Sequence, residues 1–154
     1  MKKVVFVCLG NICRSPMAEA VFRQMVQEEG LDYAIQIDSA ATSSWEAGNP
    51  VHAGTVKRLL KEGITTTGMY SRQLAKQDLN ADYLIGMDSS NVENIKRFVG
   101  TQSEAVVCRL LEFAHLNRDI ADPWYTGDFD ATYRDVRIGC QALLDTIKQE
   151  LSAR

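Results

Sequence analysis

The sequence has no long hydrophobic run and no excess of basic residues. No stretch approaches the ~20 apolar residues of a membrane-spanning helix, and the apolar run 4–9 is shorter than the roughly 7–15 residues of a secretory signal. We therefore expect no membrane span and a location in the cytoplasm. The formal net charge of −3 argues against a nucleic-acid-binding protein, which normally carries a basic excess.

Metal ligands are also sparse. The two histidines, His52 and His115, stand alone, and no second pair of Cys or His follows Cys8 and Cys13 at ligand spacing. The sequence therefore predicts no metal and no other cofactor. Because no secretory signal accompanies the four cysteines, reduced thiols are favoured over disulfides.

What is present is the ordinary composition of a globular protein. The 154 residues are 45% hydrophobic and 24% charged, and they contain no repeat, linker or low-complexity tract. This length is close to that of one average domain. We therefore expect a single domain over residues 1–154.

Strand-like runs alternate with helical patterns along the chain. The predicted strands are 4–7, 35–41, 83–87 and 105–111. The predicted helices are 15–30, a second around 56–60, a third after an Asp88 cap over 92–99, and a fourth over about 128–151. Such alternation predicts an α/β fold in which helices cover both faces of a parallel sheet. Ligands of such sheets bind at the carboxyl ends of the strands.

A Cys-x5-Arg loop joins the first predicted strand to the first predicted helix. Its residues are Cys8, Leu9, Gly10, Asn11, Ile12, Cys13 and Arg14. Gly10 and Asn11 tolerate the left-handed backbone that a curled anion-binding loop requires. A helix N-terminus attracts anions, and the guanidinium of Arg14 can hold two phosphate oxygens. The loop is therefore predicted to bind phosphate.

Cys8 would lie at the bottom of this loop. The positive field that attracts phosphate also stabilises a thiolate, the nucleophilic form of cysteine, and the Ser15 hydroxyl would add a hydrogen bond to the sulfur. Ser15 and Pro16 are also expected to serve as N-cap and first residue of the helix. The segment has neither the Gly-Lys-Ser/Thr ending of a nucleotide P-loop nor the glycine spacing of a dinucleotide fingerprint. The alternative is a small cysteine buried at a strand end.

Asp122 is the best candidate for the acid that a phosphate ester's leaving group needs. It lies in a loop before the last helix, where Pro123 restricts the backbone and Trp124 and Tyr125 form an apolar wall for an aromatic substrate. The alternative is a turn aspartate before proline, which is common.

With these motifs the sequence resembles the low-molecular-weight protein tyrosine phosphatase family along its whole length. The segments 38–42 (Asp-Ser-Ala-Ala-Thr) and 48–50 (Gly-Asn-Pro) also match. The resemblance implies a flavodoxin-like three-layer sandwich around a four-stranded parallel sheet in the order 2-1-3-4. It implies metal-independent hydrolysis of phosphotyrosine monoesters, with tyrosine-phosphorylated proteins and a tyrosine kinase as partners.

The resemblance also implies a role for each site residue. Cys8 is the nucleophile that forms a phosphocysteine, Arg14 holds the phosphate, and Asp122 protonates the leaving group and then activates water. Asn11 keeps the shape of the loop with help from Ser39. The remaining phosphate- or substrate-binding residues are Leu9, Gly10, Ile12, Cys13, Ser15, Trp45, Trp124 and Tyr125.

Three other functions are compatible with parts of these motifs. Arsenate reductases of this fold need a later redox pair of cysteines around the third strand, whereas only Cys108 and Cys140 remain here. Protein arginine phosphatases carry Thr where Ile12 stands, and an apolar Ile12 suits a phenyl ring better than a guanidinium. A phosphate-binding module without turnover would have lost a reacting group, but all are present.

The loop also suggests sensitivity to oxidation. Cys8 and Cys13 lie at the two ends of a tight curl, so a disulfide between them is predicted after mild oxidation of an accessible thiolate. The alternative is that Cys13 only packs beneath the loop.

Overall fold

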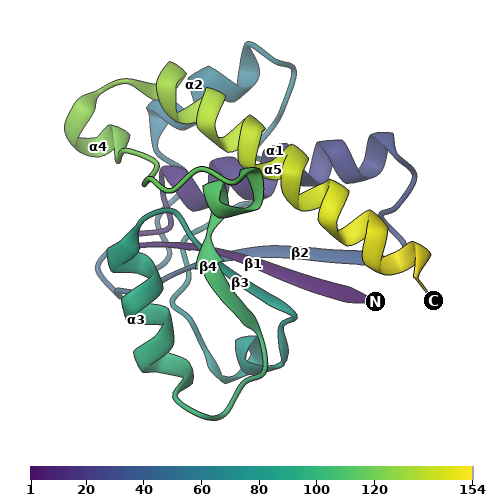
Figure 1. Cartoon of the computed structure of the whole chain (residues 1–154). Coiled ribbons are helices and arrows are strands. Elements are labelled where there is room, and N and C mark those ends of the chain that lie inside the picture. Colours follow the sequence, from purple (N-terminus) through teal and green to yellow (C-terminus); the bar gives the residue numbers. More distant parts are fainter. Residues whose placement is uncertain (154) are drawn as a thin grey trace.

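The computed structural model describes residues 1–153, which form a four-stranded parallel sheet in the order β2-β1-β3-β4 (Figure 1). The strands are β1 (Lys2–Cys8), β2 (Ile35–Ala41), β3 (Tyr83–Gly86) and β4 (Val106–Arg109). The central strand β1 pairs with both β2 and β3, and β3 pairs with β4. The predicted fold class and the strand order implied by the resemblance are confirmed.

Helices cover both faces of this sheet, which gives the expected three layers. The α-helices are α1 (Arg14–Glu28), α2 (Ala53–Leu60), α3 (Ser89–Val99), α4 (Pro123–Thr126) and α5 (Phe129–Ser152), and η1 (Lys76–Asn80) and η2 (Leu110–Ala114) are short 3-10 helices. In Figure 1, α1 and α5 lie on one side of the sheet and α3 on the other. Helix α2 packs on α1 and α5 rather than on the sheet. Within residues 1–153 no helix is long and apolar enough to cross a membrane.

The central position of β1 follows from its sequence. Four of its seven residues, Val4, Val5, Phe6 and Val7, are fully buried. Because side chains alternate along a strand, Val4 and Phe6 enter the core beneath α1 and α5, while Val5 and Val7 enter the core beneath α3. Both faces are apolar, as a strand buried on two sides requires. The carboxyl end of β1 therefore opens onto the edge of the sheet at Cys8.

The first strand is longer than the predicted run 4–7, and β3 and β4 both end earlier than predicted. β3 stops at Gly86, one residue before Met87, because the chain turns there into the Asp88 cap of α3, whose carboxylate accepts from Asn91 N–H at 2.7 Å. β4 ends at Arg109, where η2 begins, instead of running to Leu111. The apolar residues that suggested a longer strand are buried in that 3-10 turn.

The expectation that Ser15 caps α1 is wrong. The helix begins at Arg14, Cys13 occupies the N-cap position, and no side chain caps the helix. Ser15 is fully buried in the first turn, where its hydroxyl lies 3.0 Å from Cys8 Sγ. The first turn also contains no acidic residue. The positive end of the α1 dipole thus faces the loop without an acidic side chain in its own first turn to neutralise it.

Candidate active site

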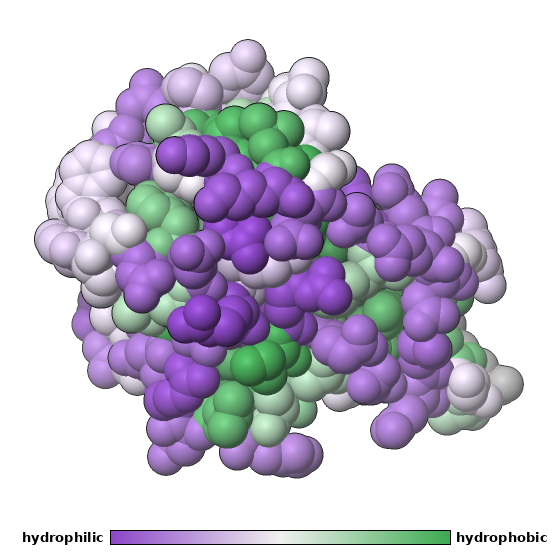
Figure 2. Space-filling view, turned by 90° about the horizontal axis from the view of Figure 1, so that it is seen from above, coloured by the Kyte–Doolittle hydropathy of each residue, from purple (hydrophilic) through white to green (hydrophobic). Residues whose placement is uncertain are grey.

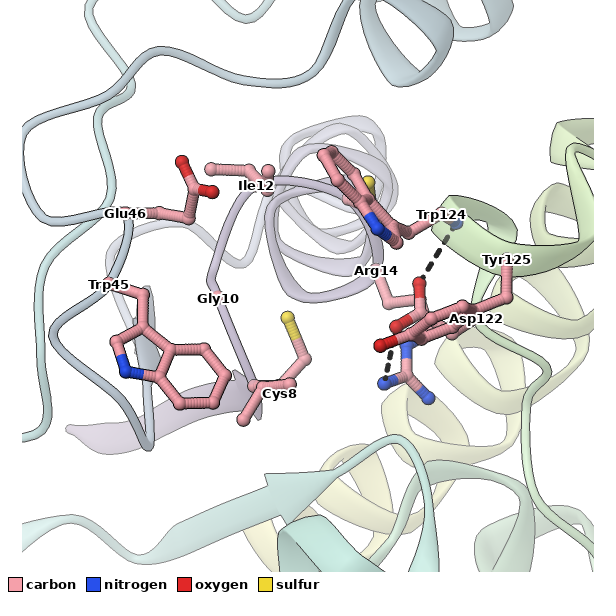
Figure 3. Close-up of a pocket in the computed structure, with 11 residues that line it drawn as sticks. Cys8, Gly10, Ile12, Arg14, Trp45, Glu46, Asp122, Trp124 and Tyr125 are labelled. Carbon is pink, nitrogen blue, oxygen red and sulfur yellow. Dashed lines mark hydrogen bonds and ion pairs between the residues drawn. The ribbon is translucent and has the colours of Figure 1, made fainter.

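A cavity of about 170 Å³ lies over the carboxyl end of β1 and the start of α1 (Figure 3). It brings together the three predicted reacting residues, Cys8, Arg14 and Asp122, although Asp122 is far from the others in sequence. The other lining residues are Leu9, Gly10, Ile12, Cys13, Trp45, Glu46, Trp124 and Tyr125. Glu46 is the one lining residue that the sequence analysis did not single out.

The loop between β1 and α1 has its carbonyl groups turned outward. Five of them accept hydrogen bonds from other segments: Cys8 from Thr42 N–H (3.0 Å), Leu9 from Ser43 Oγ (2.8 Å), Gly10 from Ser71 Oγ (2.8 Å), Ile12 from His52 N–H (2.8 Å) and Cys13 from Thr55 Oγ1 (3.2 Å). In contrast, the N–H groups of Gly10, Ile12 and Cys13 have no acceptor within residues 1–153. Free N–H groups on a curled loop at a helix start form an anion-binding nest.

Asn11 is the residue that turns this loop. Its φ of 55° is left-handed, and its N–H donates to Cys8 Sγ at 3.3 Å. Its side-chain amide donates to Ser15 Oγ at 2.8 Å and to Ser39 Oγ at 2.9 Å, while its Oδ1 accepts from Arg72 N–H at 3.1 Å. The contact between Asn11 and Ser39 is the one that the resemblance implied.

Gly10 does not adopt the left-handed backbone that was predicted for it, because the turn is made by Asn11 alone. A Cβ atom at Gly10 would lie 3.3 Å from Glu46 Cγ. Glycine is therefore favoured at position 10 by the close approach of the Glu46 side chain rather than by backbone conformation.

A chain of hydrogen bonds fixes the direction of the Ser15 proton. Ser39 Oγ donates to Glu19 Oε1 at 2.6 Å, so its lone pair is free to accept from Asn11. Ser15 Oγ also accepts from Asn11, which leaves its own proton for Cys8 Sγ. The Cys8 sulfur therefore receives hydrogen bonds from the Ser15 hydroxyl and from the Asn11 N–H.

Glu19 was missed by the sequence analysis, although a signal existed. It is a buried carboxylate, 7% exposed, within a helix whose neighbouring positions are apolar. Its other oxygen accepts from Arg23 at 2.8 Å. A charged residue inside an apolar stretch indicates a buried polar partner. Here that partner is Ser39.

Arg14 is buried, and its guanidinium is oriented by two hydrogen-bond acceptors. Its side chain is 3% exposed, and its Nη1 donates to Asp88 Oδ2 at 2.8 Å and to the Ile120 carbonyl at 2.9 Å. Burial alone would lower the pKa of Arg14, but Cys8, Asp88 and Asp122 together raise it above its ordinary value. The guanidinium is therefore a fixed positive charge. Asp88, predicted only as a helix cap, also orients this charge.

Asp122 combines the two interpretations that the sequence left open. It is the N-cap of α4, where its Oδ1 accepts from Trp124 N–H at 3.0 Å and Pro123 occupies the first helical position. Its other oxygen, Oδ2, lies 3.5 Å from Arg14 Nη2 and faces the cavity (Figure 3). The turn thus fixes a carboxyl group at the mouth of the site.

Three aromatic side chains flank the opening. Trp45, Trp124 and Tyr125 are exposed by 77%, 57% and 78%. Figure 3 shows Trp45 on one side of the Cys8 sulfur and the other two rings across from it. A flat substrate ring would fit between such walls. The side chains of Asn11, Ser15 and Ser39 do not line the cavity, and lie behind the loop instead.

The second cysteine of the loop differs from the first. Cys13 lines the cavity, but burial, followed by the charges of Asp122 and Cys8, raises the pKa of Cys13 to about 12. It is therefore a protonated thiol at neutral pH. All four cysteines are free, and residues 1–153 contain no cluster of three or more His, Cys, Asp or Glu suited to a metal ion.

A parallel α/β sheet that places a cysteine thiol under an anion-binding helix start defines a class of cysteine-based phosphate-handling proteins. A family model described as low molecular weight phosphotyrosine protein phosphatase matches residues 3–153. The chain is 43% identical over 153 residues to the low molecular weight protein-tyrosine-phosphatase YfkJ of Bacillus subtilis, covering 97% of this chain and 98% of that protein. The chain therefore belongs to the low molecular weight phosphotyrosine protein phosphatase family, as the resemblance implied.

Solved structures agree with this assignment. The crystal structure of YfkJ has a TM-score of 0.91 at 42% identity and covers 97% of this chain and 96% of that chain. SP-PTP, a low molecular weight protein tyrosine phosphatase from Streptococcus pyogenes, has a TM-score of 0.85 at 44% identity, covering 99% and 98% of the two chains. A drosophila arginine phosphatase has a TM-score of 0.86 at 29% identity, covering 96% and 98%.

Proposed function

We propose that this protein hydrolyses phosphotyrosine in proteins through a phosphocysteine intermediate. The observation that carries the proposal is the convergence of three free loop N–H groups and the Arg14 guanidinium around the Cys8 sulfur. These donors would bind the phosphate oxygens and stabilise the charge that develops on them in the transition state. The same groups surround the Cys8 sulfur, which attacks as the thiolate because the thiolate is the nucleophilic form of cysteine.

The reaction proceeds in two displacements at phosphorus. The Cys8 thiolate attacks, a sulfur–phosphorus bond forms, and the bond to the tyrosine oxygen breaks while Asp122 gives that oxygen a proton. The Asp122 carboxylate then takes a proton from a water molecule whose oxygen attacks the phosphocysteine. Inorganic phosphate leaves and the thiolate is restored. Arg14 remains charged throughout and holds two phosphate oxygens.

The walls of the cavity favour a phenyl ring over a shorter or more polar side chain. Cys8 is 4% exposed at the base of the site, so a phosphate must reach it on a long stem. Trp45, Trp124 and Tyr125 would flank the ring of phosphotyrosine, and aromatic contacts of this kind contribute about 0.5–1.5 kcal/mol each beyond burial. Ile12 offers no hydrogen-bond partner to a guanidinium, which disfavours phosphoarginine.

We further propose that residues 1–154 act as one phosphatase domain in the cytoplasm. A reducing compartment keeps a catalytic thiol from forming disulfides, and the four free cysteines fit such a setting. A tyrosine kinase that produces the substrates would be its functional partner.

The test is phosphate release from p-nitrophenyl phosphate in the presence of a metal chelator. Wild-type protein is expected to turn over, and Cys8→Ser to bind phosphate without turnover, because a hydroxyl in this site does not ionise. Phosphotyrosine peptides should react far faster than phosphoserine or phosphoarginine peptides of the same sequence. Turnover by Cys8→Ser would overturn the assignment of Cys8 as the nucleophile. A preference for phosphoarginine would overturn the assignment of phosphotyrosine as the substrate.

A further inference from the structure

A second, open groove of about 1010 Å³ adjoins the active-site cavity and runs along α2. We call it the α2 groove; its lining residues are Ile12, Glu46, Asn49, Pro50, Val51, His52, Ala53, Val56, Lys57, Leu60, Lys61 and Trp124. Figure 2 shows this end of the molecule from above, with an apolar area over α2 near the upper edge of the view. Nothing in the reaction derived above uses this groove.

The α2 groove is continuous with the active site. Ile12, Glu46 and Trp124 line both the cavity and the groove. The start of α2 is tied to the phosphate-binding loop, since the His52 N–H donates to the Ile12 carbonyl and Thr55 Oγ1 donates to the Cys13 carbonyl. A chain held in the groove would therefore be held in fixed register with a phosphate over the loop.

The floor of the groove is closely packed. The His52 ring stacks on Phe129 of α5 at 5.4 Å and meets Trp124 edge to face at 5.6 Å. A Cβ at Gly54 would lie only 2.3 Å from the Phe129 ring, so α2 approaches α5 as closely as a glycine permits. A preformed groove binds a peptide without first having to order its own walls.

The outer wall carries apolar and positive groups that no other described residue covers. Leu60 is 59% exposed, and the ammonium groups of Lys57 and Lys61 have no ion-pair partner within residues 1–153. Arg58 of the same helix, which does not line the groove, is by contrast paired with Glu62 and Asp130. The two lysines therefore offer free positive charge at the far end of the groove, while Glu46 places a negative charge at its near end.

We propose that the α2 groove binds the substrate polypeptide beside phosphotyrosine, selecting an aliphatic residue next to it and a carboxylate farther along. The proposal rests on the phosphotyrosine hydrolysis proposed above. From His52 to Lys61 the helix rises about 14 Å, which an extended peptide spans in about four residues. The carboxylate should thus lie about four residues from phosphotyrosine, where it meets Lys57 and Lys61. An acidic residue directly beside phosphotyrosine would be repelled by Glu46.

The experiment compares kcat/KM for matched phosphotyrosine peptides. One peptide carries Leu next to phosphotyrosine and Glu at the fourth position, a second has Ala at both, and a third has Lys at the fourth; each is made with the flank on the N-terminal and on the C-terminal side. Wild type should cleave the Leu/Glu peptide about three- to tenfold faster than the Ala peptide in one of the two directions. Equal rates in both directions would overturn the proposal.

Charge reversal supplies the matched variants. Lys57→Glu/Lys61→Glu should lose the preference for Glu and favour the Lys peptide, whereas Lys76→Glu/Lys96→Glu, which makes the same charge change on the other side of the sheet, should behave as wild type. Leu60→Ser should remove the preference for Leu. All variants should hydrolyse p-nitrophenyl phosphate at the wild-type rate, because that substrate does not reach the groove.

Two results separate this proposal from the one on which it rests. If Lys57→Glu/Lys61→Glu keeps the wild-type peptide preference, the groove has no role in selection although phosphotyrosine hydrolysis stands. If wild type cleaves no phosphotyrosine peptide at all, the proposed function fails and the groove proposal fails with it.

Discussion

Replacing Asp88 by Asn should destabilise the protein in a way that phosphate reverses. The Asp88 Oδ2 atom is the nearest counter-charge of the buried Arg14 guanidinium, at 2.8 Å. The other oxygen caps α3 through Asn91 N–H, a bond that the Asn side chain can keep because Asn is itself a good N-cap. The substitution therefore removes a charge from the Arg14 site and leaves the helix end intact.

The loss of stability expected for Asp88→Asn depends on how deeply Asp88 and Arg14 are buried. Removing one partner of a fully buried ion pair costs about 3–5 kcal/mol. Asp88 is 22% exposed, and Arg14 retains the Ile120 carbonyl and Asp122, so we expect a loss of about 1–3 kcal/mol. In a protein of this size each kcal/mol corresponds to roughly 2–4 °C in Tm, which gives a fall of about 2–12 °C.

Thermal unfolding with and without inorganic phosphate measures this effect. Bound phosphate supplies the missing negative charge beside Arg14, so it should raise the Tm of Asp88→Asn more than that of wild type. Asp119→Asn is the control, because that carboxylate is 48% exposed and pairs with Arg109 and Ser89 rather than with Arg14. If Asp88→Asn melts like the control and shows the wild-type response to phosphate, Asp88 does not neutralise Arg14 as described.

Three further predictions concern the reacting groups. Asp122→Asn should lower kcat for phenyl phosphate by about 10²–10⁴-fold, but far less for a dinitrophenyl ester, whose leaving group needs no proton; equal losses would argue against Asp122 as the acid. Mild peroxide should produce a Cys8–Cys13 disulfide detectable by mass spectrometry. Because Cys13 has a pKa of about 12, its thiolate fraction and hence the rate of disulfide closure should rise about tenfold per pH unit between pH 7 and 10; irreversible oxidation without this bond would favour a packing role. Ile12→Thr should shift the ratio of rates toward phosphoarginine peptides, and an unchanged ratio would contradict the reading of the pocket wall.

The parts of the site that depend on neighbouring residues are predictable from the sequence. The run 4–7 predicted a doubly buried strand, and the Cys-x5-Arg spacing after it predicted the loop, because both depend on neighbouring residues. Asp122 required an argument from chemistry, since nothing in its spacing brings it near Cys8. Arg72 and Ser71, which hold the loop from outside, carry no signal in a single sequence, because their contacts are made by sheet and turn geometry.

The Cys-x5-Arg motif alone does not determine the curled shape of the loop between β1 and α1. A left-handed backbone at Asn11 costs about 1–2 kcal/mol for an ordinary residue, and the sequence supplies only the residue type that tolerates it best. Three side-chain hydrogen bonds, to Ser15, Ser39 and Arg72, each contribute about 0.5–1.5 kcal/mol and together offset that strain. The loop is thereby held in its phosphate-binding shape by the surrounding protein. Its donors need little rearrangement when phosphate arrives, which is the condition for strong electrostatic stabilisation of a transition state.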